Sequence, residues 1–168
     1  TVTGITYNGV ALSLIVARST ITLVGRVECW GLANPTSGSN TIAVTLSGSI
    51  TSVGTAVSYV NVNQTTSTEG ANSNQATNVG AADATVDITS TVNNAWVHAA
   101  IATDDASITA SQTTRNNVTG VGGSGADEDT GPITPAGVTT MRYTDVGALT
   151  TWAIAGYVIV PFGSEPVV

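Results

Sequence analysis

The sequence contains no lysine, a single histidine (His98), a single cysteine (Cys29) and few charges of either sign, which make up 9% of its residues. Proton transfer, nucleophilic attack and metal ligation in proteins depend on clustered histidine, cysteine, lysine or carboxylate side chains. The scarcity of these groups argues against an enzyme, and no serine lies in a nucleophile-elbow pattern. A lone cysteine also excludes an internal disulfide.

Basic residues are equally scarce: the four that occur are all arginines, and the net charge is −7. Binding to nucleic acid and to anionic membrane surfaces both depend on clustered basic side chains. The sequence therefore predicts neither kind of partner. It also lacks the run of about 18 apolar residues that a membrane-spanning helix requires. The negative charge stays compatible with a cation or a basic partner surface.

Residues that favour strands over helices, above all threonine and valine, are abundant throughout the chain. Short alternating segments are separated by turn residues, which predicts an all-β, single-domain antiparallel β-sandwich or jelly roll of about nine or ten strands. Residues 1–162 are expected to form the domain and residues 163–168 a tail. The dipeptide Asn8-Gly9 predicts a tight turn between strands over 2–7 and 10–17.

Two further strands are indicated by their apolar patterns. Over residues 41–47, Ile42, Val44 and Leu46 point to one side, which predicts a face packed on a core. Residues 151–160 form the most apolar run and are expected to be a central strand. Residues 53–62 also read as a strand. The polar residues 63–80 are expected to be a surface loop with short extended pieces, and the glycine-rich residues 116–135 a long functional or mobile loop.

Three carboxylates are concentrated at Asp127, Glu128 and Asp129, within the second of these loops. Loops rich in oxygen ligands suit Ca²⁺, which takes 6–8 of them. We therefore consider Asp127 and Asp129 as calcium candidates, against the alternative of a solvated acidic loop. The spacing is not that of an EF-hand, and neighbouring acids do not easily reach one ion. The pair Asp104-Asp105 is expected to cap a turn instead.

The remaining candidate residues have structural interpretations. Cys29 lies in an apolar run and is expected to be a buried, inert thiol, with a reactive or intermolecular thiol as the alternative. His98 shares one strand face with Trp96, and without a neighbouring cysteine or aspartate it is expected to be structural or exposed. The tryptophans Trp30, Trp96 and Trp152 are expected to anchor cores, with a sugar-stacking platform as the alternative.

Three segments resemble a recurrent β-sandwich module of phage-encoded and secreted proteins. They are Tyr7-Asn8-Gly9-Val10-Ala11-Leu12, the stretch from Trp30 to Gly48, and Trp152 to Gly156. Their order and their presence near both ends indicate a resemblance over most of the chain. The motifs are turns and core positions, so the resemblance implies a fold and no site residues. Proteins with such modules are adhesins, tail or capsid appendages, or carbohydrate-contacting extracellular proteins.

These observations predict a non-enzymatic virion structural protein, a capsid decoration or cement protein or an appendage such as a head fibre or spike. It would form a homo-oligomer, such as a trimer, and bind other virion proteins at the virion surface. The start Thr1-Val2-Thr3-Gly4 shows no signal peptide, which fits removal of an initiator methionine or, alternatively, a processed precursor. The alternative function is a secreted carbohydrate-binding or adhesion module that binds a glycan.

Overall fold

Thirteen β-strands and no helix occur in the computed structural model, which describes residues 1–168 except 22–24, 78–82, 105–107, 120–122, 145–150 and 165–168. The strands are β1 (Val2–Tyr7), β2 (Val10–Ala11), β3 (Ser13–Ser19), β4 (Arg26–Gly31), β5 (Ile42–Leu46), β6 (Thr68–Thr77), β7 (Ala84–Thr89), β8 (Trp96–Thr103), β9 (Thr109–Ala110), β10 (Thr113–Val118), β11 (Ser124–Asp129), β12 (Val138–Thr144) and β13 (Thr151–Ile159). They form open antiparallel sheets, as predicted for a single-domain β-sandwich. This part of the chain has no helix with the length and apolar character of a membrane span.

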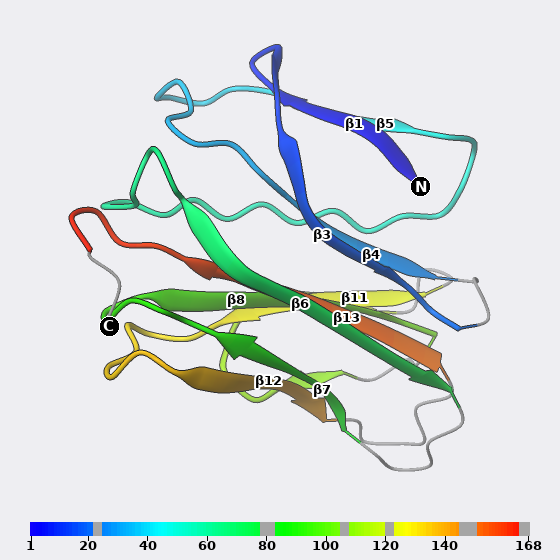
Figure 1. Ribbon diagram of the computed structural model, residues 1–168. Helices are drawn as coiled ribbons and strands as arrows, with labels where there is room; N and C mark the ends of the chain where they lie inside the picture. The colour runs from blue at the N-terminus through cyan, green and yellow to red at the C-terminus, as the bar shows by residue number, and fades with distance from the viewer. Residues whose placement is uncertain (22–24, 78–82, 105–107, 120–122, 145–150, 165–168) are drawn as a thin grey trace.

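A five-stranded sheet in the order β10-β11-β8-β13-β6 lies in the middle of the molecule (Figure 1). The sheet β7-β12-β9 covers one of its faces, and the hairpin β3-β4 covers part of the other. Each contact has its own apolar cluster, the larger one on the β7-β12-β9 side and a smaller one around Val27 and Cys29 of β4. The central strands β8 and β13 are therefore covered on both faces, whereas the edge strands β6 and β10 are not.

The sequence of strand β13 reflects the coverage of both its faces. It reads TWAIAGYVI without alternation, and it is a central strand that pairs with β6 on one side and with β8 on the other. Ile154 and Val158 pack into the cluster shared with β7 and β12, whereas Ala153 and Ala155 face β4. A strand buried on both faces needs apolar residues at successive positions. The central place predicted for residues 151–160 is confirmed.

The N-terminal sheet, composed of β2, β1 and β5 in that order, lies at one end of the molecule beyond β3 and β4 (Figure 1). The Asn8-Gly9 turn joins β1 to β2, and both residues have positive φ, 50° and 79°. A two-residue type I′ turn requires positive φ at both positions, which Asn-Gly tolerates. The predicted turn is thus confirmed. After Leu12 the chain no longer pairs with β1. It continues as β3, which pairs with β4.

Two predictions in the first half of the chain are wrong. Residues 53–62 form no strand: they run extended and make only an isolated bridge from Val62 to Pro161. Val53 of this segment lies against Gly125 of β11, whereas Val57 and Val60 are exposed. Residues 63–80 are not a loop throughout, because β6 occupies Thr68–Thr77. Its polar sequence fits an edge strand in which no described side chain is fully buried, and residues 78–80 lie outside the described part.

The second predicted loop, residues 116–135, is also wrong. Strand β10 extends to Val118 within it, and β11 follows at Ser124–Asp129. β11 pairs with β10 on one side and with β8 on the other. Glycine and acidic residues are poor strand formers, so local propensity misled the prediction and tertiary contacts decided the structure.

Candidate functional site: a buried acidic strand and its polar network

The acidic segment of β11 lies inside the protein. Asp127 is 1% exposed, and Glu128 and Asp129 are 0% exposed. The interpretation as a solvated acidic loop is therefore wrong. A buried carboxylate is costly unless it accepts hydrogen bonds or pairs with a cation, so each of the three acids requires its own account.

Alternation along β11 sends the carboxylates to opposite faces of the central sheet. Glu128 pairs in register with Ala99, which belongs to the core shared with β7 and β12. Asp127 pairs with Ala100, which packs on the β4 side. Successive residues of a strand point to opposite faces, so Glu128 faces β12 whereas Asp127 and Asp129 both face the β4 side.

Glu128 is held by backbone donors. Its Oε2 accepts the N–H of Gln112 at 2.7 Å, and its Oε1 accepts the N–H of Arg142 at 3.1 Å. Burial raises the pKa of Glu128, and these backbone hydrogen bonds oppose the rise. The side chain thus connects the residue before β10 to β12.

Asp129 is held by side chains from two distant segments. Its Oδ2 accepts the Nε–H of Arg115 at 2.7 Å and the hydroxyl of Tyr59 at 2.6 Å. Arg115 is the extra residue of a bulge in β10, between Thr114 and Asn116. A bulge re-aims the side chain that it carries. The Arg115 guanidinium also lies 5.9 Å from the ring centre of Trp96.

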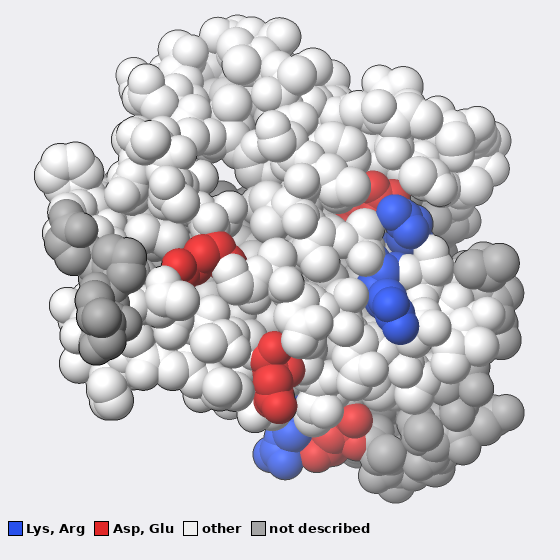
Figure 2. All heavy atoms as spheres, viewed as in Figure 1, with Lys and Arg blue, Asp and Glu red and all other residues white. Residues whose placement is uncertain are grey.

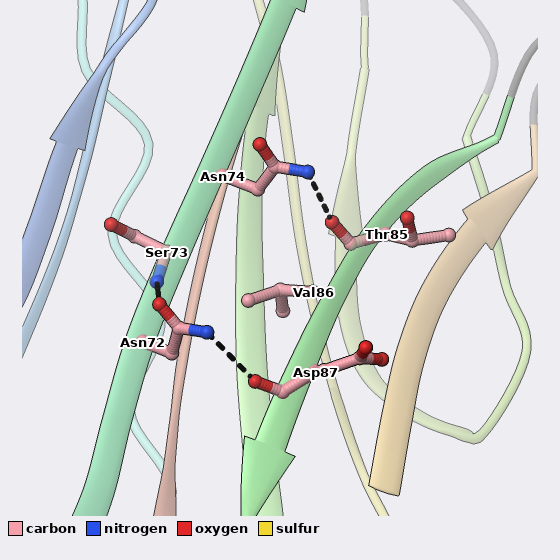
Figure 3. A pocket seen from close by; sticks show the side chains of 6 residues that line it. All are labelled: Asn72, Ser73, Asn74, Thr85, Val86 and Asp87. Atoms are coloured by element: carbon pink, nitrogen blue, oxygen red, sulfur yellow. Dashed lines mark hydrogen bonds between the residues drawn. The ribbon is translucent and has the colours of Figure 1, made fainter.

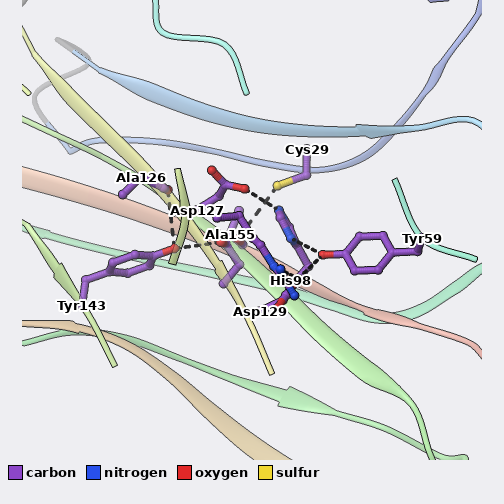
Figure 4. A network of polar contacts seen from close by, with 10 residues as sticks. Cys29, Tyr59, His98, Ala126, Asp127, Asp129, Tyr143 and Ala155 are labelled. Atoms are coloured by element: carbon purple, nitrogen blue, oxygen red, sulfur yellow. Dashed lines mark hydrogen bonds and ion pairs between the residues drawn. The ribbon is translucent and has the colours of Figure 1, made fainter. Parts of the chain in front are cut away.

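His98 connects the two aspartates through Tyr59 (Figure 4). Its Nδ1 lies 3.1 Å from the Tyr59 hydroxyl oxygen. Because the single hydroxyl proton of Tyr59 goes to Asp129, Nδ1 carries a proton and donates it to Tyr59. In a neutral imidazole this leaves Nε2 as an acceptor, and Nε2 faces Asp127 Oδ2 at 3.9 Å.

Asp127 is the member of the network with the weakest hydrogen bonding. Neither of its oxygens has a hydrogen bond of standard geometry among the described residues, and the same holds for Asp129 Oδ1. Burial raises the pKa of Asp127; the neighbouring Thr55 side chain opposes the rise and the Asp129 charge adds to it. When Asp127 is ionised and His98 is neutral, the Asp127 carboxylate and His98 Nε2 face each other as two acceptors.

The ionisation of the network limits what it can do chemically. Burial lowers the pKa of His98 to about 4, so the imidazole is neutral near pH 7. Burial raises the pKa of Cys29 to about 12, and the Asp127 charge adds to the rise. The Cys29 thiol is 6% exposed and stays protonated, as the inert-thiol prediction requires. A protonated, buried thiol is a poor nucleophile and a poor metal ligand.

The structure brings the two calcium candidates together on one face of β11. Asp129 Oδ2 is already occupied by Arg115 and Tyr59, which leaves Asp129 Oδ1 and the two Asp127 oxygens. No group of three or more His, Cys, Asp or Glu side chains in the described residues is arranged to hold a metal ion. The calcium site thus gains no further carboxylate ligand and stays a prediction.

Sequence reasoning identified the acids but missed their partners. Tyr59, His98 and Arg115 come from three segments that no sequence pattern connects. Only His98 had a usable indication, because period two in β8 already placed it on the face that carries Ala100. With β11 recognised as a strand, the same rule would have placed Asp129 beside His98.

The network makes stability depend on pH through His98. The unfolded chain takes up a proton near pH 6.5 and the folded chain only near pH 4. The free energy of unfolding should therefore fall as pH is lowered across this interval. His98→Gln, which keeps a donor for Tyr59, should remove this part of the fall. Melting temperatures of both proteins over a pH series test this, since Asp127 titrates in both. Parallel curves would contradict it.

A polar groove between β6 and β7 is the other candidate surface (Figure 3). Asn72 and Asn74 of β6 donate their side-chain amides to the carbonyls of Asp87 and Thr85 in β7, at 2.9 and 3.0 Å. The amides thus join the edges of two sheets. No aromatic ring lines the groove, so it lacks a surface on which a sugar could stack.

The tryptophans divide between core and surface. Trp152 is buried at 4%, which confirms its place in the core. Trp30 and Trp96 are only partly buried. Trp30 donates its Nε1–H to Glu28 of the same strand, at 3.2 Å, and Trp96 contacts Tyr59 edge to face at a ring distance of 6.0 Å.

Comparisons with protein-family models, with curated proteins and with solved structures find no match for this chain. The resemblance to phage-encoded and secreted β-sandwich modules therefore stays a prediction.

Proposed function

We propose that this chain is a non-enzymatic structural protein of a virion, a capsid decoration or cement protein or an appendage, that acts through protein–protein surfaces. The observation that carries the proposal is the N-terminal sheet. No residue of β1, β2 or β5 is buried. A small sheet needs a covered apolar face for its stability, and this requirement favours a surface that other protein subunits complete.

The distribution of charge supports the same proposal. Arg18, Arg26 and Glu28 are the only charged side chains before Glu69, so the net negative charge comes from the rest of the chain. The surface over β1 and β5 accordingly carries no charged side chain in Figure 2. The buried centres of protein interfaces are depleted of charge, as this end of the molecule is.

Exposed apolar side chains are concentrated in the same part of the chain. The large ones before Glu69 are Val10, Leu14, Ile21, Ile42, Val44, Ile50, Val57 and Val60. Single exposed apolar residues are ordinary, but grouped ones favour an interaction surface.

The decisive experiment is quantitative mass spectrometry, with electron microscopy, of particles purified from the culture in which the gene is expressed. We expect the chain in high copy on the particle surface. Absence from every particle, together with binding to a defined glycan on an array, would overturn the proposal in favour of a secreted carbohydrate-binding or adhesion module.

A further inference from the structure

The registers of the N-terminal sheet place its large apolar side chains on one face. Tyr7 pairs with Val10 on one side and with Ile42 on the other, and Ile5 pairs with Val44. Residues that pair directly across antiparallel strands share a face. We call these five residues the apolar face.

The opposite face of the same sheet is made of small and polar residues. Thr6 pairs with Ala11 and with Ala43, and Gly4 pairs with Thr45. The sheet is therefore amphipathic, but the prediction that the apolar side of residues 41–47 packs on a core is wrong, because Ile42 and Val44 are exposed. The apolar face is nevertheless left uncovered: Val10 is 50%, Ile42 46% and Val44 51% exposed.

We propose that the apolar face binds the same face of a second copy of the chain, so that two N-terminal sheets pack as a sandwich across a twofold axis. This inference rests on the proposed function, because it names the partner of the surface on which that function depends. In such an isologous contact each residue is used twice. The arrangement would complete a two-layer core that one chain only half provides.

Charge selects a second copy as the occupant. Each chain carries a net charge of −7, so two copies repel each other wherever their charged surfaces meet. Strands β1, β2 and β5 contain no charged residue. This sheet is therefore a surface on which two copies approach without juxtaposing like charges, and it offers no charge by which to select a basic or acidic partner.

The size of the apolar face predicts the strength of the contact. The three strands contain six, two and five residues, which at about 3.3 Å per residue and about 4.8 Å between strands give a face of roughly 200 Å². A standard stable interface covers about 800 Å² per partner. Two copies alone should therefore associate reversibly, with a dimer fraction that rises with protein concentration.

Sedimentation velocity of the full chain over a wide concentration range tests the inference. Two variants at neighbouring positions, one on each face of the sheet, are compared with the original chain. Val44→Thr buries an unpaired hydroxyl in both copies and should weaken dimerisation at least about tenfold. Thr45→Val makes the reverse exchange on the opposite face and should leave the dimer fraction as in the original chain. An equal effect of the two variants, or none from Val44→Thr, would overturn the inference.

Hydrogen exchange of β1 and β5 amides shows whether a variant still forms the sheet. If Val44→Thr unfolds it, Val10→Thr on β2 becomes the deciding variant, with the same expected loss. A chain that stays monomeric at every concentration overturns the inference, even if purified particles contain it in high copy and thereby support the proposed function. A reversible dimer that occurs in no particle supports the inference and contradicts the proposed function.

Discussion

Glu128→Ala is expected to lower the free energy of unfolding by about 3 kcal/mol. The substitution leaves the backbone N–H groups of Gln112 and Arg142 without their acceptor inside the protein. A hydrogen bond to a charged group contributes about 1.5–3 kcal/mol. Loss of a buried carboxylate returns part of this cost, because its own desolvation disappears. Urea unfolding at pH 7, followed by circular dichroism, measures the difference.

Two further variants separate the acceptor role from charge. Glu128→Gln keeps one acceptor oxygen but turns an NH₂ group toward the other backbone donor, so an intermediate loss of about 1–2 kcal/mol is expected. Asp83→Asn removes a solvent-exposed acid that bonds the Arg142 side chain at 3.0 Å. An exposed pair contributes little, so this control should change stability by less than about 1 kcal/mol. A Glu128→Ala loss no larger than that of the control would refute the assignment.

The fold class could be predicted from the sequence because strand signals are local. The Asn8-Gly9 turn is fixed by positive φ, and residues 151–160 are apolar at successive positions because both faces of β13 are covered. The prediction failed where local composition and tertiary environment disagree. Strand β11 reads SGADED, which has the composition of a loop, and it becomes a strand because β8 and β10 pair with it on both sides.

The candidate site was harder to predict than the fold. Its acids are adjacent in sequence, but their partners are contributed by the extended segment 51–60, by β8 and by a bulge in β10. Nothing about Tyr59 in the sequence indicates that its hydroxyl forms hydrogen bonds with Asp129 and His98. The apolar alternation over residues 41–47 did predict a one-sided face. The sequence could not tell that the chain itself leaves this face uncovered.

Asp127→Asn and Asp129→Asn should change stability in opposite directions at pH 7, although both acids lie on one face of one strand. Asp129 accepts two hydrogen bonds, one from a cation, and its neutral replacement should lose about 2 kcal/mol. Asp127 accepts no hydrogen bond of standard geometry, and only the Thr55 side chain partly stabilises its charge. Its neutral replacement removes a buried unpaired charge and can donate an amide proton toward His98 Nε2, so we expect a gain of about 1–2 kcal/mol.

The pH dependence of the Asp127→Asn gain distinguishes this cause from better packing. Because burial raises the pKa of Asp127, the fold favours the protonated acid, and its stabilising contribution is lost as pH rises through the folded-state pKa. The gain from Asp127→Asn should be fully developed near pH 7 and disappear below the ordinary pKa of 3.8, where the acid is protonated in both states. Unfolding of the original chain and the variant at both pH values measures this. A gain that is the same at both would show that the charge of Asp127 is not its source.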